Sequence, residues 1–266
     1  MIKMRPRLGR QRRQDMTAFA DLELIALSAR SRGFFTDVEL HVPGLPNAIL
    51  VRGRFDLESY TDDLFNLLAL HCPASLSAAV AVRRAEFLAG RAMAHAALRA
   101  LGQAAAEIPI GLGGAPLWPS SSAGSISHTR GHCACFAIAN ANWRAGVDVE
   151  ALASGHALDA ILNMTTNEDE RALIARQVVL SPDRLASLVF SAKETLFKAL
   201  YPVARRFFGF DCAELRRTPR NGQLRLHLTQ TICPELLEGQ HYDIRFSIAA
   251  GHVLTWLAVT PQHMSM

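Results

Sequence analysis

The sequence lacks several features that would assign it to a common protein class. No apolar run approaches the roughly 20 residues of a membrane-spanning helix. The longest candidate near the start, residues 22–29, is short, contains Glu23 and has no clear cleavage site, so we expect neither a secretory signal nor a membrane partner. A G-x-x-x-x-G-K-[ST] loop and a G-x-G-x-x-G fingerprint are also missing, which argues against standard P-loop and Rossmann nucleotide sites.

Cysteines are few, odd in number and never spaced as C-x-x-C. Such usage is typical of a reducing compartment without a disulfide framework, so we expect a cytoplasmic protein. The group formed by His128, His132, Cys133 and Cys135 matches no common zinc spacing, and its cysteines fall in an apolar stretch. The five cysteines are Cys72, Cys133, Cys135, Cys212 and Cys233.

Positive charge is concentrated at the beginning of the chain. Residues 1–15 contain six basic residues against Asp15, a net charge of +5, whereas the whole chain carries +4. The remaining residues therefore sum to −1, and the high isoelectric point does not describe the folded body. A basic arm can bind nucleic acid. The plainer interpretation, a disordered tail over residues 1–16, is the one that we expect.

The pattern of secondary structure predicts an α+β fold. With 266 residues, half of them hydrophobic, the chain can bury the core of one large domain or of two halves. Long helices are expected over 77–101 and 181–202, the second with Ser181 as N-cap, Pro182 at its first position and Pro202 at its end. Residues 108–127 are expected to form a loop between short strands. Strands are expected over 133–140, 145–150, 223–230, 242–250 and 253–260. Helices and hairpins thus occur in two successive batches, which suggests two similar halves.

Three carboxylates could form a site with an all-oxygen donor set. In the run GVDVE, Asp148 and Glu150 are two residues apart and share one face of a strand. In FSAKETLFKAL, Glu194 and Lys198 share a helix face, beside Lys193. Carboxylates suit Mg²⁺, and the lysines could face phosphate oxygens that the ion does not neutralise. Alternatively, Glu194 and Lys198 form an ordinary solvated ion pair.

Two further stretches suit a phosphate ligand. The run GSISH ends in Ser127 and His128, and the run RRAEFLAGR places Arg83, Arg84 and Arg91 on one helix. Each also has an ordinary structural interpretation, a strand-end histidine in the first run and a solvated helix face in the second.

Together, these motifs resemble those of the 4'-phosphopantetheinyl transferases. The order R-R-x-E-F-x-x-x-R, P-x-W-P, G-S-I-S-H, G-V-D-V-E, F-S-A-K-E-x-x-F-K-A and RRFFGF is similar to the enterobactin-synthase-component branch, which suggests siderophore biosynthesis. The likeness runs from about Leu76 to the final strands, and more loosely back to Thr17. It implies a pseudo-twofold pair of α+β halves with the active site at their interface, over residues 17–145 and 146–266.

The resemblance also implies an activity. The family moves the phosphopantetheine arm of coenzyme A to a serine of an acyl or peptidyl carrier protein, and it needs Mg²⁺. Asp148, Glu150 and Glu194 would then hold the ion, and Glu194, directly or through a water, would be the base for the carrier serine. Lys193 and Lys198 would bind phosphates and stabilise the leaving adenosine 3',5'-bisphosphate.

By the same resemblance, Arg83, Arg91, Ser127 and His128 would bind the adenosine 3'-phosphate end of coenzyme A. One departure is the run GLGGAP, where many relatives carry a lysine or arginine before P-x-W-P, so one phosphate contact is expected to be missing. We expect a monomer that docks an acidic carrier protein on a basic segment. That segment contains Arg205, Arg206, Arg216, Arg217 and Arg220.

Two rival hypotheses remain at this point. The first is another Mg²⁺-dependent transferase acting on a pyrophosphate, which explains the carboxylates and lysines but not the ordered motifs. The second is a non-catalytic protein that binds nucleic acid through its basic arm. Deletion of residues 1–15 separates them, because a transferase keeps its activity without the arm; under the main hypothesis no nucleic acid is a partner.

Overall fold

The computed structural model describes residues 23–104 and 106–261, so the tail predicted over residues 1–16 lies outside the described part. The chain divides into two compact units. Among the described residues, the N-terminal unit comprises 23–104, 106–122 and 131–140, and the C-terminal unit comprises 123–130 and 141–261. The predicted boundary at residue 145 differs from this division because strand β3 (Ala123–Thr129) lies against β5 (Arg144–Ala151) in the C-terminal unit.

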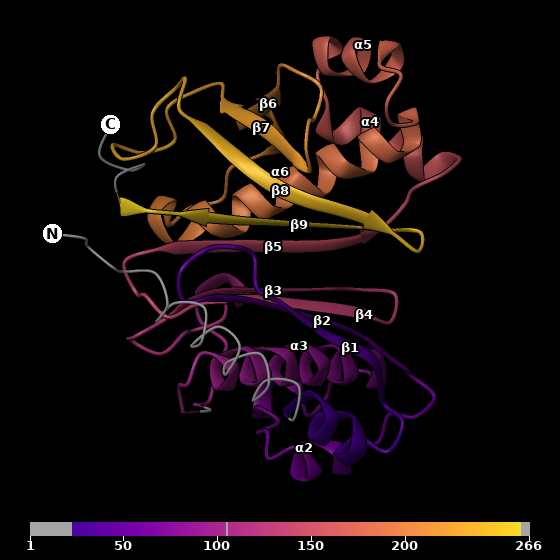
Figure 1. The fold of residues 1–266 in the computed structure, drawn as a ribbon, viewed down its shortest axis with the longest axis vertical. Helices are drawn as coiled ribbons and strands as arrows, with labels where there is room; N and C mark the ends of the chain where they lie inside the picture. Colours follow the sequence, from indigo (N-terminus) through magenta and orange to yellow (C-terminus); the bar gives the residue numbers. More distant parts are fainter. Residues whose placement is uncertain (1–22, 105, 262–266) are drawn as a thin grey trace, which may run out of the picture. The chain divides into compact units, whose positions relative to one another are not determined.

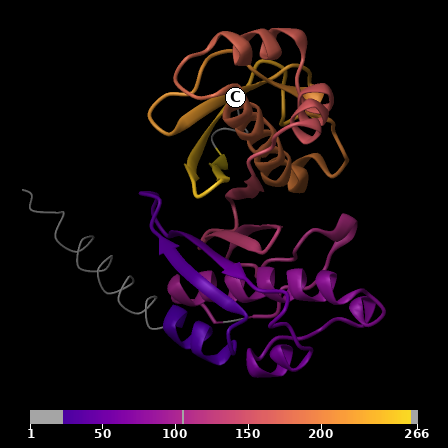
Figure 2. The same ribbon diagram turned by 90° about the vertical axis from the view of Figure 1, so that its right-hand side faces the viewer.

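In the N-terminal unit, strands β1 (Phe35–His41), β2 (Ala48–Phe55) and β4 (His132–Ile138) pair antiparallel in the order β1-β2-β4. Helix α3 (Ala81–Ala100) packs on β2 and β4, and Figures 1 and 2 both show it beside these strands. The short helix α2 (Asp63–Leu67) precedes it. The predicted helix over residues 77–101 is confirmed, four residues shorter at its start.

Packing explains the position of α3. Alanine, leucine and arginine favour the helical conformation, and the helix buries Leu88, Met93 and Leu98 completely. Phe136 of β4 and Leu50 of β2 are buried on the sheet side. Each such side chain contributes about 1.5–3 kcal/mol when fully buried, so hydrophobic packing fixes the helix on the sheet.

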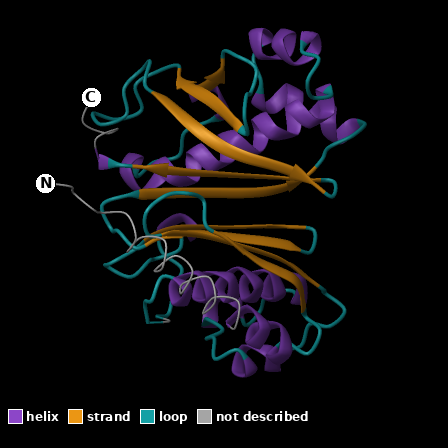
Figure 3. Ribbon diagram, viewed as in Figure 1, coloured by secondary structure: helices purple, strands orange, loops and turns teal. Residues whose placement is uncertain are grey.

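In the C-terminal unit, five strands pair antiparallel in the order β5-β9-β8-β7-β6. The other four are β6 (Ala213–Leu215), β7 (Gln223–Leu228), β8 (His241–Ala249) and β9 (His252–Val259). Helix α6 (Pro182–Ala204) packs on β5 and β9, and Figure 3 shows it along this sheet. Helices α4 (His156–Thr165) and α5 (Glu168–Arg176) precede it.

Most of the predicted strands are confirmed, and the differences have physical causes. Ser181 and Pro182 begin α6 as expected, but Pro202 lies inside the helix, which ends at Ala204. A proline this close to the end removes a single backbone hydrogen bond, so the helix continues. The GSISH run is a strand, not the predicted loop, and α4 and α5 were not predicted. Within the described residues, no helix is long and apolar enough to cross a membrane.

Candidate active site

Asp148 on β5 lies at the centre of a buried polar set in the C-terminal unit. Its Oδ1 accepts hydrogen bonds from the Ser127 hydroxyl of β3 at 2.9 Å and from the Lys198 ammonium of α6 at 2.7 Å. The same ammonium also donates to the Ser127 hydroxyl at 3.0 Å. Only 2% of Asp148 is exposed. Charge-assisted bonds therefore join two strands and a helix at one carboxylate.

The second oxygen of Asp148 is different. Oδ2 is buried and has no hydrogen-bond partner among the described residues. A buried carboxylate oxygen without a donor costs free energy, and such exceptions in a folded protein call for an explanation. A ligand that brings a positive charge to Oδ2 would satisfy it.

Glu150 lies two residues further along β5, on the face that Asp148 also occupies. Its Oε2 accepts from the Thr129 hydroxyl of β3 at 3.2 Å. Burial, and next the charge of Asp148, raise the pKa of Glu150 to about 7. The two carboxylates therefore repel each other across a half-buried surface, and Lys198 offsets only part of that repulsion.

Glu194 completes the acidic group from α6, one turn before Lys198. It is half-buried. Burial raises its pKa, the ammonium of Lys198 lowers it, and the charge of Asp148 raises it. The three acids thus interact electrostatically, but within residues 23–104 and 106–261 no three His, Cys, Asp or Glu side chains form a compact metal-binding group. Instead, Asp148 pairs directly with Lys198, so magnesium binding stays a prediction.

Gly146 sets how closely α6 approaches β5. A Cβ atom at this position would lie 2.0 Å from the carbonyl oxygen of Thr195, in the middle of the helix. Thr195 also donates from its hydroxyl to Thr255 O of β9 at 3.3 Å. The glycine therefore permits the contact that places Lys198 within reach of Asp148, a role that no pattern in the sequence indicates.

We expect Gly146→Ala to lower the free energy of unfolding by roughly 1–3 kcal/mol, because the methyl group forces α6 away from β5. Urea denaturation followed by circular dichroism measures this change. The matched control is Gly53→Ala on β2, where the added Cβ meets a movable methyl group of Val38 at 3.1 Å. Equal losses in the two variants would contradict the special role of Gly146.

The predicted role of Lys193 in phosphate binding needs correction. Its ammonium donates to Glu170 Oε2 at 2.8 Å and to Thr165 O at 2.6 Å, and only 4% of the residue is exposed. Neighbours on an α-helix point about 100° apart, so Lys193 and Glu194 face different surroundings. Lys193 is a structural residue that joins α6 to α4 and α5.

Glu170 makes this pair a junction of several elements. Besides Lys193, it accepts from the backbone N–H of Asn167 at 3.1 Å, as part of the α5 capping box, and from that of Leu215 on β6 at 2.8 Å. Burial lowers the pKa of Lys193, and the charge of Glu170 opposes that shift. The ion pair therefore connects α5 and β6 to the helix that carries Glu194 and Lys198.

We expect Lys193→Met to lower the free energy of unfolding by about 3 kcal/mol, because it leaves Glu170 buried and charged without its partner. Urea denaturation measures the loss. The double variant Lys193→Met with Glu170→Gln removes the unpaired charge and keeps a neutral acceptor for one of the two backbone donors, so it should recover part of the stability. A single-variant loss below about 1 kcal/mol, as in an exposed pair, would show that the pair is unimportant.

The N-terminal unit contains the predicted arginines. Arg91 is 8% exposed, donates from Nε to Ile108 O at 2.6 Å and lies 4.5 Å above the ring of Phe87. Burial lowers its pKa to about 10, so it stays charged at neutral pH. It lines a cavity of about 380 Å³ together with His95. Arg83 lies 3.6 Å from Glu86 near the start of the same helix, half-exposed.

The other predicted nucleotide contacts lie on β3. Ser127 points to Asp148, and alternation along a strand directs the half-buried His128 to the opposite face. The GLGGAP run forms a short 3₁₀ turn over Leu112–Gly114 with positive φ at Gly113 and Gly114. Coenzyme A binding by Ser127 and His128 stays a prediction.

Comparison with known families gives consistent matches in both units. Residues 72–138 match the 4'-phosphopantetheinyl transferase N-terminal domain. Residues 144–256 match the 4'-phosphopantetheinyl transferase superfamily, a region that includes the three carboxylates and Lys198. The two matches together cover more than half of the chain.

Individual proteins give the same result. The chain is 34% identical to 4'-phosphopantetheinyl transferase Svp of Streptomyces mobaraensis, over 74% of this chain and 81% of that protein. It is 37% identical to enterobactin synthase component D of Salmonella typhi, over 60% of this chain and 65% of that protein. It is 36% identical to 4'-phosphopantetheinyl transferase PptT of Mycobacterium tuberculosis, over 53% and 61% respectively.

Proposed function

This chain belongs to the 4'-phosphopantetheinyl transferase superfamily, and we propose that it moves the phosphopantetheine arm of coenzyme A to a serine of an acyl or peptidyl carrier protein. The observation that carries the proposal is the hydrogen-bonded set of Ser127, Asp148 and the partly exposed Lys198, with Glu150 and Glu194 beside it. The ammonium of Lys198, held in place by a carboxylate, suits transfer chemistry at a pyrophosphate, because negative charge there must be offset.

We assign Mg²⁺ to Asp148, Glu150 and Glu194. Their oxygens are the ligands that this ion prefers, and the unpartnered Oδ2 of Asp148 fits a bound cation. When bound, the ion would offset negative charge on the substrate's pyrophosphate. The repulsion between Asp148 and Glu150 supplies a further reason for a cation at this place.

The chain's own residues have distinct roles in this proposal. Lys198 is oriented by Asp148 and Ser127, and 26% of its side chain is exposed. It can therefore stabilise the charge of a leaving phosphate while it keeps a fixed position. Glu194, half-buried on the preceding turn, is the candidate to accept the proton of the carrier serine.

We place the nucleotide end of coenzyme A at Arg91. Its guanidinium is held in place by Ile108 O and the Phe87 ring and faces a cavity that also contains His71 and His95. Arginine is suited to phosphate because its planar donors match phosphate oxygens. Arg83, Ser127 and His128 stay predictions for the same substrate.

We further propose that the protein works in a reducing compartment such as the cytoplasm. All five cysteines are free thiols, and Cys133 and Cys135 are buried in β4. Burial raises the pKa of both thiols, so they behave as small apolar side chains.

Incubation with coenzyme A, Mg²⁺ and apo carrier proteins tests the function directly. Intact-mass spectrometry should show a gain of one phosphopantetheine group on at least one carrier, from a panel that covers fatty-acid, polyketide and siderophore synthesis. The gain should disappear when the carrier serine is replaced by alanine or when EDTA is added. No gain on any carrier in the panel would refute the proposed activity.

A further inference from the structure

Strand β3 presents two hydroxyls to the two carboxylates of β5. The Ser127 hydroxyl donates to Asp148 Oδ1 at 2.9 Å, and the Thr129 hydroxyl donates to Glu150 Oε2 at 3.2 Å. Donor and acceptor are 21 residues apart in both bonds. Because this separation is constant, the two strands run in the same direction at this place, and side chains two apart on one strand meet side chains two apart on the other. The hydroxyls therefore match the carboxylates one to one.

The two hydroxyls contact different groups. The Ser127 hydroxyl oxygen also accepts from the Lys198 ammonium at 3.0 Å and from the backbone N–H of Val149 at 3.3 Å. Loss of the Ser127 hydroxyl would therefore disturb a lysine, an aspartate and a strand together. Among the described residues, the side-chain hydrogen bond of Thr129 reaches Glu150 and no other group. Thr129 can thus act on one carboxylate without changing the rest of the polar set.

The carboxylate of Glu150 is held less firmly than that of Asp148. Asp148 is 2% exposed and pairs with the Lys198 ammonium at 2.7 Å. Glu150 is half-buried, and its hydrogen bond within the described part of the chain comes from the neutral hydroxyl of Thr129. A glutamate side chain has three rotatable bonds and loses rotamer freedom when it is fixed. Threonine is stiff at χ1 because it is branched at Cβ, so its hydroxyl is suited to hold that carboxylate in one orientation.

The bond between Thr129 and Glu150 matters more for orientation than for folding. Both residues are partly exposed, so water can replace the hydroxyl as a donor when the hydroxyl is removed, and stability changes little. A metal ligand is more sensitive. Hydrogen bonds to ligating carboxylates fix their direction, and loss of such a partner typically weakens metal binding about 10–100-fold.

We propose that Thr129 is a positioning residue that orients Glu150 for the Mg²⁺ ion. This inference rests on the proposed function, in which Asp148, Glu150 and Glu194 hold the ion, and it adds a residue that acts through Glu150. Each carboxylate of β5 then has one oxygen bonded to a hydroxyl of β3, from Ser127 in one case and from Thr129 in the other. Strand β3 therefore orients the two acids of β5 before the ion binds.

Removal of the Thr129 hydroxyl tests the proposal. Mn²⁺ prefers the same oxygen ligands as Mg²⁺, and its binding in the presence of coenzyme A is measured by electron paramagnetic resonance. We expect Thr129→Val to raise the Kd of Mn²⁺ about 10-fold or more. The Mg²⁺ concentration for half-maximal transfer should rise by the same factor, whereas kcat at saturating Mg²⁺ and KM for the carrier should change less than about threefold. Thr129→Ser keeps the hydroxyl and should restore metal binding.

Three controls separate positioning from a general loss of structure. Thr36→Val makes the same chemical change at an exposed position of β1 and should leave metal binding unchanged. Thr129→Ala removes the hydroxyl without adding a methyl group and should behave like Thr129→Val. When Glu150 is already alanine, Thr129→Val should change the Kd of Mn²⁺ less than about twofold, because a residue that acts through Glu150 has no effect once that carboxylate is gone.

The outcomes differ from those that test the transferase activity. If the unmodified protein transfers nothing to any carrier, the proposed function fails, and the role of Thr129 fails with it. If it transfers normally and Thr129→Val binds Mn²⁺ as tightly as the unmodified protein, only the positioning role fails. A loss that Thr129→Ser does not restore, a loss of full size in the Glu150→Ala background, or unfolding of both Thr129→Val and Thr129→Ala would show that the hydroxyl serves packing, and each would overturn the proposal.

Discussion

Replacement of Asp148 by asparagine is expected to lower kcat/KM for phosphopantetheine transfer roughly 10³-fold while the protein remains folded. Asparagine keeps the size of the side chain, and its carbonyl can still accept from Ser127 and Lys198 at the place of Oδ1. Its amide nitrogen takes the place of Oδ2, which has no donor in the described structure. The variant can therefore keep both hydrogen bonds of Oδ1, but the negative charge at the centre of the site is gone.

Two consequences of that lost charge explain the size of the effect. Lys198 is no longer held by an ion pair, so its ammonium can leave the position from which it would meet the leaving phosphate. The site also loses Oδ2, the carboxylate oxygen that is buried without a partner among the described residues, and with it a proposed ligand for Mg²⁺. Each effect alone removes charge stabilisation in a half-buried environment, where it is worth more than in water.

Steady-state kinetics with a modified carrier as product measures this loss, and thermal unfolding checks the fold. Asp159→Asn, an exposed acid in the first turn of α4, serves as the control and should leave kcat/KM unchanged. Calorimetry with Mg²⁺ and coenzyme A should show weaker ion-dependent binding for Asp148→Asn. Activity within 10-fold of the unmodified protein would show that Asp148 is only a structural partner of Lys198.

The sequence was sufficient to group Asp148 and Glu150 with Glu194 and Lys198, because each pair lies within one regular strand or helix. Period-two alternation in GVDVE directs Asp148 and Glu150 to one face, and both contact β3 as that pattern requires. Helical spacing likewise keeps Glu194 and Lys198 on one side of α6. Such periodicities are local, and the strand and helix that carry them were both predicted correctly.

Lys193 shows where local reasoning fails. Its neighbour Glu194 suggested a shared site, but its partner Glu170 lies on α5, a helix that was not predicted, 23 residues earlier in the chain. Gly146 is a similar case, since only the distance to Thr195 O reveals why a side chain is excluded. Both facts depend on how separate elements pack, and no periodicity in the sequence encodes that.

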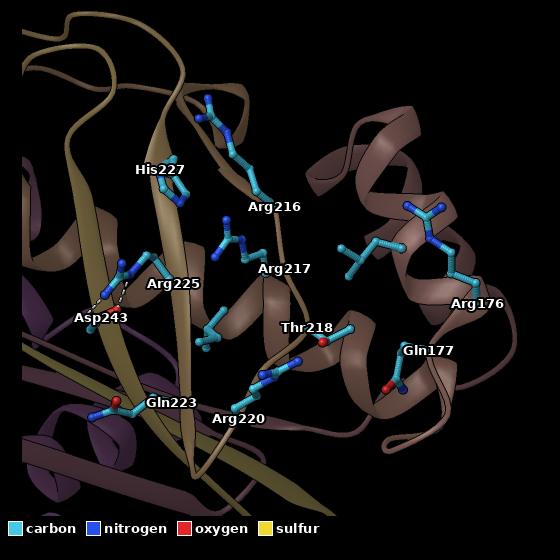
Figure 4. Close-up of a pocket in the computed structure, with 12 residues that line it drawn as sticks. Arg176, Gln177, Arg216, Arg217, Thr218, Arg220, Gln223, Arg225, His227 and Asp243 are labelled. Atoms are coloured by element: carbon cyan, nitrogen blue, oxygen red, sulfur yellow. Dashed lines mark hydrogen bonds and ion pairs between the residues drawn. The ribbon is translucent and has the colours of Figure 1, made fainter.

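The groove lined by five arginines, between the end of α5, the loop after β6 and strands β7 and β8 (Figure 4), could be predicted only in part. Three of its arginines, including Arg217 and Arg220, lie in one short basic segment and were identified as a docking candidate. Arg176 and Arg225 join them only because α5 and β7 border the same space. The cluster of basic residues in the sequence therefore predicted one side of the groove, and the packing of α5 and β7 forms the other sides.

Glu194→Gln is expected to reduce kcat for transfer by roughly 10³-fold or more, to the limit of the mass assay, without unfolding the protein. Glutamine fills nearly the same half-buried space on α6 but can neither accept the proton of the carrier serine nor offset a cation. The Ser127, Asp148 and Lys198 bonds do not involve Glu194 and should persist. Coenzyme A measured without Mg²⁺ should therefore bind within twofold of the unmodified protein.

This pattern distinguishes Glu194 from Asp148. Loss of Asp148 releases Lys198, so it should weaken coenzyme A binding even without Mg²⁺, whereas loss of Glu194 should leave that binding intact and remove the chemical step. Glu168→Gln, at the exposed start of α5, is the matched control and should retain full activity. If Glu194→Gln keeps more than a tenth of the activity, another group is the base. The carboxylate of Glu194 then serves only to balance the positive charge of Lys198.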